Sequence, residues 1–224
     1  GRRQMLLHRR ACGRAYADRT DILMLRAWVA IKRGLAGLFD FQGRSSRTDF
    51  WFYAIFVALI AFGFWSVVMS MELTRTFGDI NQYAAQNPDK VTVSAGPGGY
   101  SVSIKDGAAG VGPDFGYLLN WITAIAVVSI GLLAAASVRR LHDTNRTGAW
   151  ILLPMPFLFG GLWLMALVFQ DFNSASEPDF GWFFMGFANN LIYMATLGFV
   201  VFLLLRSGTA GENRFGRRDM DEES

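Results

Sequence analysis

The sequence has little of what a soluble enzyme or a disulfide-bonded protein requires. Of its 224 residues only one is cysteine and two are histidine. Charged residues make up 17%, whereas about 25% is usual for a soluble domain. A single cysteine excludes an intrachain disulfide, so nothing indicates an oxidising compartment. Cys12 also lies in no Cys/His arrangement typical of a thiolate nucleophile. The shortage of charge favours a membrane protein.

Four stretches contain no charged residue and no histidine over their whole length. They cover residues 50–71, 115–138, 147–170 and 180–205. A helix needs about 20 apolar residues to cross the hydrocarbon core of a bilayer, and a buried soluble helix rarely runs that far without a polar face. We therefore predict an all-α membrane protein with four transmembrane helices.

Lysine and arginine are distributed very unevenly between the two sides of these stretches. Residues 1–49, the link 139–146 and the tail 206–224 carry 18 of them, whereas the loops 72–114 and 171–179 carry three. The side with more lysine and arginine usually faces the cytoplasm. The distribution therefore predicts a multi-pass protein with both termini and the middle link in the cytoplasm. The lipid bilayer, with its anionic headgroups, is the expected partner.

The terminal segments differ from the membrane domain that we expect over residues 24–217. Residues 1–23 are basic, and we expect a disordered extension there, since Met24 is suited to be the natural start. Their arginine pairs lack the interleaved aromatic residues of a nucleic-acid interface, so we expect no nucleic-acid partner. Residues 218–224 form an acidic tail.

Residues 24–38 are consistent with a short interfacial helix. Leu25, Trp28, Val29 and Ile31 would face lipid, and the basic residues between them would meet headgroups. A frayed helical lead-in to the first span is the alternative.

The first outer loop contains a hairpin pattern. Apolar and polar residues alternate on both sides of the turn sequence Gly96-Pro97-Gly98-Gly99, and the apolar ones are Val91, Val93, Tyr100, Val102 and Ile104. This pattern predicts a small β-hairpin. Because an isolated hairpin is only marginally stable in water, a disordered loop is the alternative.

The third span contains two prolines and two adjacent glycines. Pro154 and Pro156 remove backbone donors, so we expect the helix to be irregular near its cytoplasmic end. Gly160 and Gly161 should allow another helix to approach closely.

Two polar motifs flank the spans on the predicted cytoplasmic side. In residues 39–51, Ser46 and Asp49 have capping-box spacing immediately before an apolar run. In residues 137–150, the run Arg139-Arg140-Leu141-His142-Asp143 follows the second span.

These two motifs, together with residues 208–216 of the tail, closely resemble a bacterial family. It is the family described as domain of unknown function 805, which includes YhaH-like small inner-membrane proteins. The resemblance extends over about residues 37–217 and departs from the family in the long first outer loop and at Ala149. It implies a location in the bacterial inner membrane, and the family has no established activity.

Three interpretations of the motifs remain open. The arginines are topological anchors that touch anionic lipid, they form an anion or headgroup site with His142, or the two motifs meet. For the third case we predict one cytoplasmic polar cluster in which Asp49 or Asp143 accepts hydrogen bonds from the arginines. The candidate residues of this cluster are Arg44, Arg47, Asp49, Arg139, Arg140, His142, Asp143 and Arg146.

The sequence shows none of the motifs on which an enzymatic assignment would rest. It has no nucleophile elbow, no zinc-binding His-Glu-x-x-His and no phosphate loop, so we expect no enzyme and no cofactor. His142 and Asp143 are too few ligands for a closed metal site. Polar residues within the spans are better interpreted as interhelical hydrogen-bonding groups than as an ion pathway, and they are Asn120, Asn189, Asn190 and Tyr193.

We therefore expect a non-enzymatic membrane component that is structural or interacts with lipid. The alternative is a small transporter or channel that acts as a homo-oligomer. That alternative requires a polar, water-accessible cavity between the spans.

Overall fold

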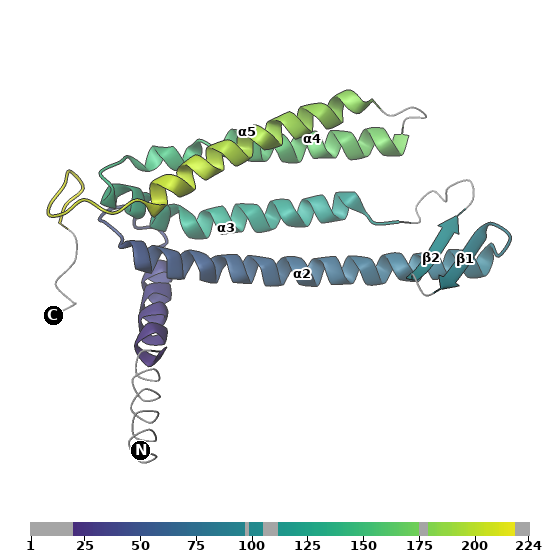
Figure 1. The fold of residues 1–224 in the computed structure, drawn as a ribbon, viewed down its shortest axis with the longest axis horizontal. Helices are drawn as coiled ribbons and strands as arrows, with labels where there is room; N and C mark the ends of the chain where they lie inside the picture. Colours follow the sequence, from purple (N-terminus) through teal and green to yellow (C-terminus); the bar gives the residue numbers. More distant parts are fainter. Residues whose placement is uncertain (1–19, 97–98, 105–111, 175–178, 218–224) are drawn as a thin grey trace, which may run out of the picture.

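The computed structural model describes residues 20–96, 99–104, 112–174 and 179–217 (Figure 1). The predicted acidic tail and most of the predicted disordered extension lie outside these residues. Residues 20–36 form a helix, which we call the N-terminal helix. The elements that follow are α2 (Arg47–Gln86), β1 (Val91–Gly96), β2 (Gly99–Ile104), α3 (Phe115–Asp143), η1 (Gly148–Leu152), α4 (Met155–Ser174) and α5 (Phe180–Leu205).

Four helical segments are long and apolar enough to cross a membrane. They are α2, α3, η1 together with α4, and α5. This confirms the predicted all-α membrane fold with four such helices.

Helix α2 is longer than the charge-free stretch that predicts the first span, because it continues to Gln86. Beyond residue 71 the helix gains two ion pairs along its own surface. Arg75 Nη2 lies 2.6 Å from Glu72 Oε1, and Arg75 Nη1 lies 2.7 Å from Asp79 Oδ2. Pairs at these spacings stabilise a helix that has left its apolar stretch.

The helices are arranged as two antiparallel pairs. Helix α2 packs along α3, and α4 packs along α5 (Figure 1). The start of α2 and the ends of α3 and α5 lie at one end of the bundle, which we call the basic end. The β-hairpin, the start of α3 and the α4–α5 connection lie at the other end, which we call the hairpin end.

The hydrophobic core is concentrated near the basic end. Its residues come from α2, α3 and α5, and they are Phe50, Tyr53, Val57, Ala136, Leu141, Val200, Leu203 and Leu204. Large apolar side chains elsewhere on the spans face outward, as lipid-facing side chains do. For example, Phe62 is 69% exposed and Phe184 is 65% exposed.

The third span is irregular near Pro154 and Pro156, as their presence predicts. The short 3-10 helix η1 ends at Leu152, and α4 begins only at Met155. Because the first residues of a helix need no N–H for an intrahelical bond, Pro154 and Pro156 are compatible with the start of α4. Gly148 allows η1 to approach α3, since a Cβ there would lie 2.6 Å from Cγ2 of Val138.

Helices α4 and α5 approach each other at the two glycines of α4. The Asn189 side chain of α5 donates to the carbonyl of Phe157 at 2.8 Å. A Cβ at Gly161 would lie only 2.8 Å from the Asn189 amide nitrogen, and one at Gly160 would lie 3.4 Å from its oxygen. The predictions of close approach and of an interhelical hydrogen bond by Asn189 are both confirmed.

The hairpin prediction is also confirmed. Strands β1 and β2 pair antiparallel, with Val91 opposite Ile104 and Gly96 opposite Gly99. The expected turn residues Pro97 and Gly98 lie outside the described residues.

The N-terminal helix runs across the direction of the bundle (Figure 1). Ala30 and Gly34 are buried in its contact with the bundle, and a Cβ at Gly34 would lie 2.4 Å from the ring of Tyr53. Met24 and Trp28 are exposed, and the Lys32 ammonium lies 4.9 Å from the Trp28 ring. The segment is therefore helical over residues 24–36, and its interfacial position stays a prediction. Residues 20–23, expected to be disordered, belong to this helix.

The contact between α4 and α5 leads to a test by substitution. We expect Asn189→Ala to lower the free energy of unfolding by about 0.5–1.7 kcal/mol, because it removes an interhelical hydrogen bond. Asn190→Ala is the matched control, since Asn190 is the adjacent residue of the same type and is exposed. Unfolding by denaturing detergent in mixed micelles measures both. Equal losses from the two variants would contradict the role of Asn189.

Candidate functional site

The last turn of α3 buries an ion pair. Arg140 and Asp143 lie three residues apart on one helix face, and neither side chain has exposed surface. Arg140 Nη1 donates to Asp143 Oδ2. Its Nε donates to the carbonyl of Leu204 at 3.0 Å, and its Nη2 donates to the carbonyl of Arg206. Because no further helical N–H reaches the last carbonyls of a helix, Arg140 supplies the missing donors at the end of α5.

Arg44 brings a second guanidinium group to the same carboxylate. Its Nε lies 3.1 Å and its Nη2 3.0 Å from Asp143 Oδ1, and both side chains are fully buried. Its Nη2 also donates to the carbonyl of Thr209 at 2.6 Å, and its Nη1 donates to the carbonyls of Gly211 and Gly216. Arg44 therefore joins the segment before α2, the end of α3 and the loop after α5.

The loop after α5 makes further contacts with the end of α3. The Thr209 N–H donates to the carbonyl of Asp143 at 2.8 Å, and the Asn213 amide donates to the carbonyl of His142 at 2.9 Å. The His142 ring stacks on Phe215 with centroids 3.8 Å apart and an interplanar angle of 6°. The C-terminal segment is thus part of the folded unit.

Arg139 makes a separate contact with the segment that follows the N-terminal helix. Its Nη1 donates to the carbonyls of Gly37 at 2.9 Å and Asp40 at 2.8 Å. A Cβ at Gly37 would lie 2.4 Å from that nitrogen, so a larger residue there would displace the guanidinium. The Ser45 N–H donates to the carbonyl of Arg139 at 3.2 Å.

We call the buried junction the Asp143 cluster, and it consists of Arg44, Arg140, His142, Asp143, Thr209 and Asn213. A buried charge is costly unless it is paired and hydrogen-bonded. Every side-chain nitrogen of Arg44 and Arg140 donates to an acceptor of the protein itself. The arrangement is therefore suited to joining chain segments. An external anion would need N–H donors of these guanidinium groups, and each of their nitrogens already donates to the protein itself.

The structure brings together part of the predicted set. Arg44, Arg140 and Asp143 are in direct contact. His142 borders them, with its Nδ1 3.3 Å from the carbonyl of Gly43, and Arg139 contacts the neighbouring loop.

Four predicted residues lie outside the cluster, and one of them is Arg139, which contacts the neighbouring loop. Asp49 or Asp143 was expected to accept hydrogen bonds from the arginines, and Asp143 is the one that does so. For Asp49 the described side-chain contact is the one that its backbone N–H makes with Ser46 Oγ at 3.1 Å. Arg47 is exposed, and Arg146 contacts the carbonyl of Leu141 through its backbone N–H at 3.0 Å. Arg44 reaches Asp143 because the chain turns immediately before it, at Gly43, where φ is 78°.

The residues that sequence reasoning missed all come from the loop after α5. They are Thr209, Gly211, Asn213, Phe215 and Gly216. Their one signal was that the tail resembles the usual ending of the family.

A second buried carboxylate lies at the hairpin end. Glu72 of α2 is only 3% exposed. Its Oε1 accepts from Arg75 Nη2 at 2.6 Å and from the backbone N–H of Asp114, the N-cap of α3, also at 2.6 Å. Glu72 therefore connects the outer part of α2 with the start of α3.

An apolar cavity of about 890 Å³ lies between the two helix pairs. It is lined by the first turns of α3, by α4, by the first half of α5 and by two residues of α2. The described residues that line it include no charged side chain, and the polar ones are Asn189, Asn190 and Tyr193. The amide of Asn189 is already bonded to α4.

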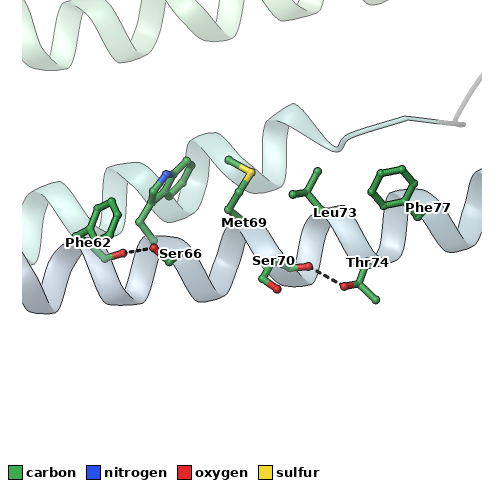
Figure 2. A pocket seen from close by; sticks show the side chains of 8 residues that line it. Phe62, Ser66, Met69, Ser70, Leu73, Thr74 and Phe77 are labelled. Carbon is green, nitrogen blue, oxygen red and sulfur yellow. Dashed lines mark hydrogen bonds between the residues drawn. The ribbon is translucent and has the colours of Figure 1, made fainter. Parts of the chain in front are cut away.

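A shallower hollow of about 500 Å³ runs along α2 and shares Trp65 and Met69 with the cavity (Figure 2). Figure 2 shows that all its lining side chains come from this one helix. Ser66 Oγ donates to the carbonyl of Phe62 and Thr74 Oγ1 to that of Ser70, both at 2.8 Å. Since one helix lines it and two of its hydroxyls bond to that helix, the cavity between the helix pairs is the better candidate for binding.

The described residues contain no group of three or more His, Cys, Asp or Glu side chains that could hold a metal ion. Fold and sites define an all-α membrane protein whose helices are joined at one end by a buried arginine–aspartate cluster and separated by an apolar cavity. The chain belongs to the family described as Protein of unknown function (DUF805), which matches residues 38–217. A comparison with curated proteins finds no match, and a comparison with solved structures finds none.

The Asp143 cluster leads to a stability prediction. We expect Arg140→Ala to lower the free energy of unfolding by about 3–5 kcal/mol, because it leaves the buried carboxylate of Asp143 with one partner fewer. Arg47→Ala is the matched control, and we expect it to change stability by less than about 0.5 kcal/mol because Arg47 is exposed. Unfolding in mixed micelles measures both variants.

A double-mutant cycle tests the pairing itself. Arg44→Ala and Asp143→Ala should show a coupling energy of about 0.5–3 kcal/mol, whereas Arg140→Ala and Asp49→Ala should be additive within about 0.5 kcal/mol. Coupling of Asp49 with Arg140 and none of Asp143 with Arg44 would overturn this assignment.

Proposed function

We propose that this protein is a non-enzymatic, lipid-interacting component of a bacterial inner membrane, and that the cavity between its helix pairs holds lipid acyl chains. The Asp143 cluster is a structural junction that keeps the helices in place around this cavity.

The apolar lining of the cavity is the observation that carries the proposal. At about 890 Å³ it lies within the range of about 300–1,000 Å³ in which ligand pockets of proteins fall. Its walls belong to helices whose composition suits the hydrocarbon core, where acyl chains are the surrounding medium. An acyl chain makes apolar contacts throughout and needs few hydrogen bonds, which matches a lining with three polar residues.

The same lining disfavours the transporter alternative. Pathways for ions or protons place ionisable groups within the membrane, and a polar substrate requires polar groups along its path. The described lining has no charged side chain. The anion-site interpretation of the arginines is weakened as well, because Arg44 and Arg140 donate to the protein's own acceptors.

The proposed orientation of the protein in the membrane rests on the distribution of basic residues. Among the described residues, only Arg75 and Lys90 are basic and lie at the hairpin end. The positive-inside rule then favours cytoplasmic termini and a cytoplasmic basic end. Exposed cations there, such as Lys32 and Arg47, are suited to contact anionic headgroups.

Lipid retention tests the proposed function. We expect the wild-type protein extracted from membranes to carry lipid in native mass spectrometry. Gly186→Leu should reduce the bound lipid, because Gly186 lines the cavity and a Cβ there would meet Leu164 at an ordinary 3.9 Å. Gly198→Leu on the same helix adds an identical side chain in open space outside the cavity, so it should leave the lipid unchanged.

Equal lipid retention in the two glycine variants would refute the cavity as a lipid site. A lipid-free protein of twice the monomer mass would indicate instead that a second copy covers the cavity.

Cysteine accessibility in intact cells tests the orientation. In a Cys12→Ser background, we expect Ser103→Cys at the hairpin end to react with a membrane-impermeant maleimide. Thr147→Cys at the basic end should react only after the membrane is permeabilised, since the basic end is proposed to be cytoplasmic. Labelling of Thr147→Cys in intact cells would reverse the topology.

A further inference from the structure

The cavity belongs to one half of the bundle. At the hairpin end its lining reaches Phe115 at the start of α3 and Phe172 near the end of α4. Phe115 stacks on Phe169 with centroids 4.3 Å apart, so aromatic rings border this end of the cavity. Tyr117 and Trp121 lie in the first turns of α3, next to these phenylalanines, and their amphipathic rings favour the depth at which headgroups begin. A lipid in the cavity would therefore belong to the leaflet at the hairpin end and place its headgroup there.

Three aspartates lie next to lining residues or at the start of a lining helix at this end of the cavity. Asp114 immediately precedes the lining residue Phe115, Asp171 precedes Phe172, and Asp179 is the N-cap of α5. The headgroup of a lipid in the cavity would therefore meet carboxylates.

These carboxylates also occupy the donors that a phosphate would seek. Asp114 Oδ1 accepts from the Tyr117 N–H at 2.9 Å, and Asp179 Oδ1 accepts from the Gly181 N–H at 2.8 Å. A helix N-terminus binds anions through such N–H groups. Since the first turns of α3 and α5 are capped by their own aspartates, they are poorly suited to attract an anionic headgroup.

The basic side chain nearest to this end on α2 is already neutralised. Arg75 lies 2.6 Å from Glu72 and 2.7 Å from Asp79. Its guanidinium is shared between two carboxylates, and it adds no net positive charge to the region.

We infer that the cavity selects lipids whose headgroup carries a protonated amine, as in phosphatidylethanolamine, over lipids with a net anionic headgroup, as in phosphatidylglycerol. This inference rests on the proposed function, because it assumes that the cavity holds lipid. An ammonium group donates charge-assisted hydrogen bonds to carboxylates, whereas an anionic headgroup is repelled by them. The hairpin end would thus prefer headgroups with a protonated amine, whereas the basic end is expected to contact anionic headgroups.

Quenching of tryptophan fluorescence tests the inference in vesicles of equimolar phosphatidylethanolamine and phosphatidylglycerol. The full-length protein is reconstituted with bromine on the acyl chains of one lipid at a time. Trp65 lines the cavity, so bromine in the cavity should quench it. We define the cavity-specific quenching as the part that is lost in Gly186→Leu and retained in Gly198→Leu. Trp65→Phe should also abolish this part of the quenching.

We expect the cavity-specific quenching to be at least about fivefold larger with brominated phosphatidylethanolamine than with brominated phosphatidylglycerol. One charge contact near a membrane surface is worth enough free energy to produce a ratio of this size. The combined change Asp114→Asn, Asp171→Asn and Asp179→Asn removes three charges and keeps amide oxygens that still cap the helices. In this variant the ratio should fall towards one.

The outcomes separate the two proposals. Equal cavity-specific quenching by both lipids, or more by phosphatidylglycerol, would overturn the inference on selectivity and leave the lipid-binding function standing. No cavity-specific quenching by either lipid would overturn both. A ratio that the three asparagine substitutions do not change would show that the carboxylates are not its cause, which also overturns the inference.

Discussion

Asp143 accepts hydrogen bonds from Arg44 and Arg140 in a place without solvent access, and the packing of the basic end depends on this contact. A carboxylate without water is stable there only if its partners stay in position. Because Arg44 precedes α2 and Arg140 also binds the end of α5, satisfying one carboxylate fixes the ends of three helices. The loop after α5 closes the site with its backbone carbonyls.

The bundle is packed most closely at the basic end, whereas at the hairpin end the two helix pairs meet through the stacking of Phe115 on Phe169. The hydrophobic core lies near the basic end, where α2, α3 and α5 converge. Towards the hairpin end, contacts within the α2–α3 and α4–α5 pairs persist, and the cavity lies between the pairs. The two ends also differ in charge, since the basic residues gather at the Asp143 cluster, whereas aspartates cap α3 and α5 at the other end. A molecule with this asymmetry meets different headgroup chemistry in each leaflet.

Several parts of this arrangement were predictable because they depend on short stretches of chain. Charge-free windows predicted all four spans, alternation predicted the hairpin, and spacing predicted Ser46 as the cap of α2. The continuation of α2 beyond residue 71 was not predictable in this way, because hydrophobicity marks where an apolar stretch ends and not where the helix ends. The ion pairs of Arg75 continue the helix beyond it. Two carboxylates were candidates for the arginines, and choosing Asp143 over Asp49 required the turn at Gly43 that places Arg44 beside α3.

The sequence by itself determined the family, the number of spans and the unequal distribution of charge between their ends, because length, hydropathy and charge are properties of each segment alone. Only the tertiary structure decided which aspartate is buried, that the loop after α5 completes its site, and that an apolar cavity separates the helix pairs. These features depend on how each helix is rotated about its axis and on contacts such as that between Arg44 and Thr209. Residues so far apart along the chain meet only after the helices have packed.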